Sequence, residues 1–227
     1  MARPILTDAE RLDWERFPAD PGPDVVGAYF TLADGEVDVL RRLPTPAGRL
    51  ATAVAVAAIR WLGFVPADLG QAPAAGVQRL AGQLDADPDE LGSYVPAERT
   101  AREHRQRAAR IARFRDADER DLARLEELLV VSALEHDSPL ALLRTAALRL
   151  RERQLLRPAL STLERLVAAA RARAERETHE LRFDVYCREK GWLDPMGFLD
   201  RRETDVDDAW AHRSGARLVL CAARRRG

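Results

Sequence analysis

The chain contains 227 residues, of which 46% are hydrophobic and 32% charged, with a net charge of −1, as in soluble globular proteins of one large or two small domains. No stretch reaches the about 18 consecutive apolar residues that a membrane-spanning helix needs, and residues 1–10 lack the apolar core of a signal peptide. We therefore expect a cytoplasmic protein without a membrane partner.

The first part of the chain carries a series of helix signals. Thr7 and Glu10 form a capping-box pattern that predicts a helix start, and the proline-containing segment 18–23 ends this helix. Further helices are expected at 25–30 and from residue 34 to the prolines that follow Leu43. Residues 50–62 are apolar on nearly every face, which predicts a buried central helix.

Residues 77–84 predict another helix, and a tight turn leads from it into a second one. Asp87 as N-cap and Pro88 at the first helical position are typical of a helix start. The pair resembles a helix-turn-helix, but the second helix opens with Asp87, Asp89 and Glu90, whose negative charges repel phosphate. We therefore interpret this unit as structural.

The later part of the chain predicts four more helices. A basic helix is expected from Arg99 to Phe114, and apolar spacing predicts others at 122–134 and 139–154. Residues 157–160 form a turn, and Ser161 with Glu164 forms a second capping-box pattern that opens a long helix to about Leu181.

These elements predict an all-α protein of two helical lobes with helix-turn-helix-like units and an irregular C-terminal tail. We expect an N-terminal lobe at 1–95, an Arg-rich lobe at 96–182 and a divergent tail at 183–227. Residues 1–95 contain 8 arginines and 14 acidic residues, whereas residues 96–180 contain 18 arginines and 15 acidic residues. This asymmetry indicates a polyanionic partner for the later part, although such a strong preference for arginine is also typical of GC-rich genomes.

Two basic segments are candidates for binding DNA. Seven arginines lie between Arg99 and Arg115, and the planar guanidinium suits phosphate because it donates two parallel hydrogen bonds. The helix pair around 157–160 is the second candidate, because its second helix would present polar and basic residues beside the free N–H groups of the helix start. A solvated helix face and an ordinary helical hairpin are the respective alternatives. The predicted DNA-binding residues are Arg99, Arg102, Arg105, Arg107, Arg110, Arg113, Thr162, Arg165, Arg171 and Arg173.

The sequence contains no recognisable catalytic or metal-binding pattern. The four histidines are scattered without the spacing of metal ligands, and neither a glycine-rich phosphate loop nor an exposed-serine motif is found. The two cysteines, Cys187 and Cys221, form neither a disulfide framework nor a metal site by themselves. We therefore expect no enzymatic activity, no cofactor and no metal ion.

Several segments are more specific as an ordered series than any one of them is alone. They are Leu6–Arg11, Tyr29–Leu32, Leu40–Arg42, Arg49–Gly63, Leu80–Leu84 with Asp87, Pro88 and Tyr94, the Arg-rich helix, and Leu160–Leu166. Across about residues 5–182 this series resembles the N-terminal region of the large replicative transposases of bacterial class II transposons, the Tn-three family.

The resemblance implies an all-helical region that recognises the terminal inverted repeats of a transposon as double-stranded DNA. It suggests a full-length transposase as a further partner, because both proteins would compete for the same ends. The family has a more basic run after Tyr29–Leu32, and it continues into a catalytic domain with three metal-binding carboxylates, whereas residues from about 184 do not resemble it. We expect a non-catalytic, truncated or solo derivative. A helical protein-interaction or scaffold module and a non-functional remnant are the alternatives.

Overall fold

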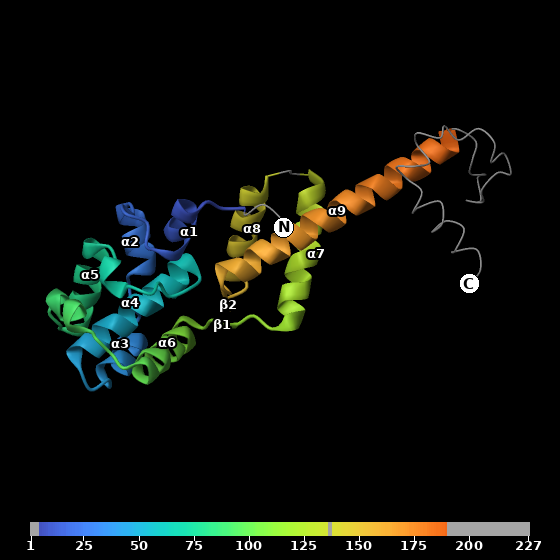
Figure 1. The fold of residues 1–227 in the computed structure, drawn as a ribbon. Helices are drawn as coiled ribbons and strands as arrows, with labels where there is room; N and C mark the ends of the chain where they lie inside the picture. Colours follow the sequence, from blue (N-terminus) through green and yellow to red (C-terminus); the bar gives the residue numbers. More distant parts are fainter. Residues whose placement is uncertain (1–4, 136–137, 190–227) are drawn as a thin grey trace. The chain divides into compact units, whose positions relative to one another are not determined.

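The computed structural model describes residues 5–135 and 138–189, whose regular secondary structure is almost entirely helical, as predicted (Figure 1). Residues up to Ala174 belong to one compact unit, and a second unit begins at Glu175 within the last helix. The irregular tail was predicted at 183–227, but residues 183–189 continue the last helix, and the rest of the tail lies outside the described residues. The helices are α1 (Asp8–Glu15), α2 (Pro23–Tyr29), α3 (Asp34–Arg41), α4 (Pro46–Leu62), α5 (Ala74–Leu84), α6 (Glu98–Ala112), α7 (Glu119–Glu135), α8 (Pro139–Glu152) and α9 (Leu160–Glu189), with two 3₁₀ helices, η1 (Leu69–Gln71) and η2 (Pro88–Ser93).

The first capping box is confirmed at the start of α1. The Glu10 N–H donates to the Thr7 hydroxyl at 3.3 Å, and the Thr7 N–H donates to the Glu10 carboxylate at 2.8 Å. These bonds satisfy N–H groups that a helix start otherwise leaves without partners. Both residues therefore have the role that their spacing predicted.

Helix α4 is the buried centre of the first hydrophobic cluster, as its composition predicted. Every residue from Leu50 to Ile59 is buried, and α6, α5 and η2 pack around the helix. Thr45 caps its start by accepting from the Gly48 N–H at 3.1 Å, and Gly63 ends it with a φ of 80°. We name as cluster 1 the apolar side chains from Phe17 to Ala112 that surround α4.

A second hydrophobic cluster is formed by α7, α8 and the first part of α9. Leu129, Leu143 and Leu163 are its fully buried centre, and Leu6 from the N-terminal segment also belongs to it. An ion pair between Arg11 and the largely buried Glu164 ties α1 to α9. We name this group cluster 2. Arg-rich α6 packs against α4 and belongs to cluster 1. The division into lobes at 1–95 and 96–182, which was based on charge balance, remains a prediction.

Two short parallel strands, β1 (Arg115–Asp116) and β2 (Leu155–Leu156), link the segments that follow α6 and α8. Arg115 pairs with Leu155 and Asp116 with Leu156. Because successive side chains of a strand point in opposite directions, Leu155 belongs to cluster 2 while Leu156 packs against cluster 1. The connection between α8 and α9 is therefore anchored in both clusters and is longer than a tight helix-turn-helix turn.

The second predicted capping box is wrong. Helix α9 begins at Leu160, one residue before the predicted N-cap, so Ser161 lies inside the helix. The Glu164 carboxylate does not reach back to Ser161, because one oxygen pairs with Arg11 and the other is buried without a hydrogen-bond partner among the described residues. The predicted helix after Asp87 is the 3₁₀ helix η2, with Asp87 accepting from the Asp89 N–H at 3.0 Å.

Candidate functional site

A groove of about 830 Å³ lies between α6 and the start of α9, and we name it the arginine groove. One wall is formed by a stripe of α6 and the other by the turn that enters α9. The stripe consists of Arg102, Arg105, Gln106, Ala109 and Arg110, and the facing turn supplies Arg157, Pro158, Ala159 and Leu160. The two basic segments that the sequence singled out therefore meet at one cavity.

The helical period explains why these arginines face the groove. Positions three, four, seven and eight residues apart share one face of an α-helix, and Arg102, Arg105 and Arg110 follow this spacing. The adjoining face carries Ala108 and Ala112, and Ala109 lies at its border with the groove; all three are buried in cluster 1 with α4. Small residues let the two helices approach closely, and the arginines are left exposed beside the groove.

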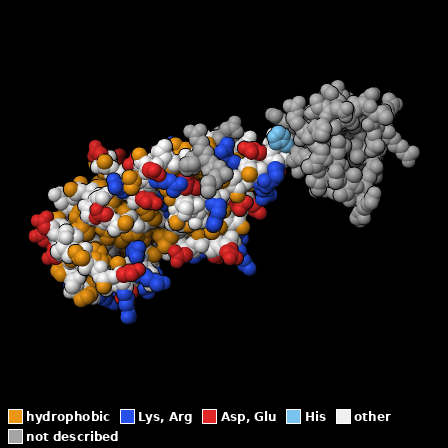
Figure 2. All heavy atoms as spheres, in the orientation of Figure 1, with side chains coloured by type: hydrophobic (Ala, Val, Ile, Leu, Met, Phe, Trp, Pro, Cys, Tyr) orange, Lys and Arg blue, Asp and Glu red, His pale blue; other side chains and the backbone are white. Residues whose placement is uncertain are grey.

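The groove arginines differ from Arg99, on the same helix, in ion pairing. Among the described residues, no acidic side chain forms an ion pair with Arg102, Arg105 or Arg110, so their charges are available to an anion. Arg99, by contrast, donates to Glu103 at 3.0 Å. Figure 2 shows basic side chains gathered along the lower edge of the molecule, where α6 lies in Figure 1.

Arg115, at the end of this basic run, is held by a fixed carboxylate. Its guanidinium donates to both oxygens of Asp121, at 2.6 and 3.1 Å. The hydrogen bond to Arg115 lowers the pKa of Asp121, with help from the Asp118 N–H, and the same bond raises the pKa of Arg115. Arg115 therefore stabilises the turn between α6 and α7, although it also lines the groove.

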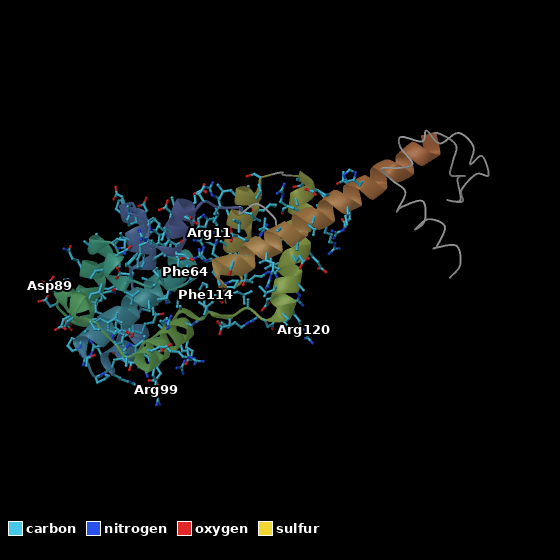
Figure 3. All side chains as sticks on the ribbon, viewed as in Figure 1. Arg11, Phe64, Asp89, Arg99, Phe114 and Arg120 are labelled. Atoms are coloured by element: carbon cyan, nitrogen blue, oxygen red, sulfur yellow. The ribbon has the colours of Figure 1, made fainter. Side chains whose placement is uncertain are left out.

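Arg157, which the sequence analysis placed only in a turn, contacts both an aromatic ring and a backbone carbonyl. Its guanidinium lies over the Phe64 ring, 3.6 Å from the centroid, and donates to the Trp14 carbonyl at 2.8 Å. Burial lowers its pKa to about 10, so it remains cationic at neutral pH. Phe64 and Phe114 also line the groove, and both are labelled in Figure 3.

The predicted DNA-binding residues fall into two groups. Arg102, Arg105 and Arg110 line the groove together. The others lie outside the lining of the groove. On α6, Arg99 is exposed and Arg107 is half-buried, and Arg113 is the C-cap of this helix. On α9, Arg165 and Arg173 are exposed, whereas Thr162 and Arg171 are half-buried.

Sequence reasoning missed Phe64, Phe114 and Arg157. The run Arg157–Leu160 was a signal for a turn, but nothing in the spacing showed which distant aromatic ring the arginine would meet. His104, one of the four histidines whose spacing does not fit metal ligands, shares a hydrogen bond of 2.9 Å with the Tyr94 hydroxyl. In the part of the chain that the structure describes, no three His, Cys, Asp or Glu side chains are grouped as metal ligands would be. Likewise, none of the described helices is both long and apolar enough to cross a bilayer.

Comparison with known proteins relates most of the chain to transposases. The family described as a domain of unknown function (DUF4158) matches residues 5–170. The chain is 27% identical over 175 residues to the transposase for transposon Tn1546 of Enterococcus faecium, covering 77% of this chain and 18% of that protein. It is 31% identical over 155 residues to the transposase for transposon Tn501 of Pseudomonas aeruginosa, covering 66% and 15%. It is 26% identical over 179 residues to the transposase for transposon Tn21 of Escherichia coli, and this alignment covers 78% of this chain and 18% of that protein.

The chain thus spans less than a fifth of the length of each of these transposases. The matched residues include the arginine groove, cluster 1 and all of cluster 2 except Ala174, and they agree with the region in which the ordered segments resembled the Tn-three family. The resemblance drawn from the sequence is confirmed: the chain belongs to the DUF4158 family and is a region related to transposases of the Tn-three family.

Proposed function

We propose that this chain takes part in DNA transposition as a double-stranded DNA-binding module that recognises the terminal inverted repeats of a transposon. The observation that carries the proposal is the arginine groove, in which three arginines without acidic partners face the start of α9. The relatives named as transposases support the choice of DNA as the polyanion. The proposal assigns no chemical step to the described residues.

The groove arginines suit the backbone of a duplex. Arg102 and Arg110 are separated by about 12 Å along α6, from the helical rise of about 1.5 Å per residue. Duplex DNA carries one negative charge per about 1.7 Å of its axis, so these side chains can neutralise neighbouring phosphates and release their counterions. We assign them contacts that set the position of the protein on DNA but do not read its sequence.

Base reading is assigned to the first turns of α9. Arg165 is exposed there, and Thr162 is half-buried one turn earlier. Arginine reads guanine through two hydrogen bonds in the major groove, and the α9 start faces the same groove as the α6 arginines. In this arrangement α6 would bind phosphate and α9 would read the base sequence.

A salt titration of DNA binding tests the proposal. The protein is mixed with a duplex carrying the terminal repeat of a neighbouring transposon and with a random duplex, over a range of salt concentrations. We expect preferential binding to the repeat, with an affinity that falls as salt rises. Arg105→Ala should weaken both duplexes alike and make the logarithmic salt slope shallower by about 1.

Arg120→Ala is the matched control, because Arg120 is an exposed arginine of α7 that lies outside the groove lining (Figure 3). It should leave both affinities and the salt slope near the wild-type values. If the wild-type protein binds neither duplex at low salt, or if the two arginine variants behave alike, the proposed groove is wrong.

A second candidate function is protein interaction, and two exposed apolar residues favour it. Val131 and Leu134 on α7 have 60% and 50% of their surface exposed. A scaffold module would use such residues rather than the groove. In that case Val131→Asp would abolish association with the partner, while DNA binding would be absent in both the variant and the wild type.

A further inference from the structure

The relative placement of the two groove walls depends on few contacts. The most extensive helix packing lies within the two clusters, where α4 contacts α6 and α5 in cluster 1 and α7 contacts α8 in cluster 2. The stripe of α6 belongs to cluster 1, whereas Leu160 and the following turns of α9 belong to cluster 2. The groove therefore keeps its width only if contacts between cluster 1 and cluster 2 fix the two clusters relative to each other.

Polar contacts from the segment that precedes α9 hold this junction. The Arg157 N–H donates to the Gly63 carbonyl at 2.7 Å, and the Arg151 guanidinium donates to the Trp61 carbonyl at 2.7 Å. Both carbonyls belong to the end of α4, where they lack partners from the helix itself. The C-terminus of α4 is thus tied both to the end of α8 and to the segment between α8 and α9.

The Arg157 side chain also connects the segment before α9 to the residues that follow α4. It stacks on Phe64, directly after α4, and bonds the Trp14 carbonyl in α1. Its Nε is buried without a hydrogen-bond partner in the described part of the chain. Burying a charged group in this way is costly, and an apolar side chain would fill the same space more favourably. A planar, stacked guanidinium supplies instead a fixed orientation.

We propose that Arg157 is a positioning residue that fixes the start of α9 against the end of α4, so that both walls of the arginine groove contact one segment of DNA. The inference rests on the proposed function. Because the guanidinium is already engaged by Phe64 and Trp14, Arg157 acts through the geometry of the groove and not by binding phosphate.

Two variants test this role in the full chain. Arg157→Lys keeps the positive charge but loses the planar group that stacks on Phe64. Phe64→Leu keeps Arg157 and removes the ring beneath it. Circular dichroism and the thermal transition verify that each variant is folded. For both, we expect the preference for repeat over random duplex to fall about tenfold with an unchanged salt slope.

A distance measurement without DNA separates this inference from the proposed function. Spin labels are placed at Thr100→Cys on α6 and Ser161→Cys on α9, both exposed, with Cys187 and Cys221 replaced by serine. Pulsed electron resonance should give a narrow distance distribution in this background and a broader one when Arg157→Lys is added.

An unchanged distance distribution would overturn the positioning role. So would equal losses on both duplexes, because a contact with phosphate carries no sequence information and its loss weakens all sequences alike. Absence of DNA binding by the wild-type protein would refute the proposed function instead, whatever the labels report.

Discussion

The packing of α5 against Phe30 allows a stability prediction that depends on atomic distances. A Cβ atom added at Gly76 would lie 2.4, 2.6 and 2.7 Å from three ring atoms of Phe30. Ordinary contact begins at 3.4 Å, so the ring would have to move by about 1 Å. Phe30 has no exposed surface and meets the Trp61 ring edge-on at 6.0 Å, so it has little room to move.

Gly82 provides the control, because it lies on the same helix and its added Cβ would meet nothing within 4 Å. Gly82→Ala should raise the free energy of unfolding by about 0.5–1 kcal/mol, since alanine loses less backbone entropy in a helix. Gly76→Ala gains the same stabilisation from backbone entropy but also has an overpacking cost of about 1–3 kcal/mol. The two variants should therefore differ by about that cost.

Urea denaturation of the wild type and the two variants measures these free energies directly. The midpoint for Gly76→Ala should fall clearly below that for Gly82→Ala. In thermal melts the same difference corresponds to about 2–4 °C for each kcal/mol in a protein of this size. Equal midpoints for the two variants would show that α5 does not pack on Phe30 as described.

Three further predictions concern the reading residue Arg165, the end of α6 and the half-buried His104. Arg165→Ala should lower discrimination at one base position by about 1–3 kcal/mol, and equal losses on repeat and random DNA would contradict its reading role. Arg113 adopts a φ of 62°, so Arg113→Gly should raise the free energy of unfolding by about 1 kcal/mol in urea denaturation; a destabilised variant would argue against this backbone conformation. Burial, assisted by Arg107 and opposed by Glu103, lowers the pKa of His104 below its ordinary value of 6.5. Protonation therefore favours the unfolded chain, and the wild type should lose stability as the pH falls below 6.5. A His104→Gln variant should lack this decline, and parallel pH profiles of the two proteins would show that His104 is not its cause.

Local patterns in the sequence determined most of the helices and the composition of the basic segments. The spacing of Thr7 and Glu10 specified the start of α1, and the unbroken apolar run in α4 required burial, because each signal depends only on neighbouring residues. The ordered segments also identified the transposase relationship. In addition, the seven arginines around α6 indicated an anionic partner before any tertiary contact was known.

Tertiary structure decided which of these residues come together. The pattern at Ser161 and Glu164 suggested a local cap, but Arg11, far away in the sequence, binds Glu164 instead. The arginines of α6 separated into a groove stripe and a remainder only when α4 buried the alanine face and α9 was placed opposite. Arg157 gained its environment from Phe64 and Trp14, which spacing cannot bring near it. Periodicity and capping depend on local geometry, whereas a groove depends on packing between elements that are distant along the chain.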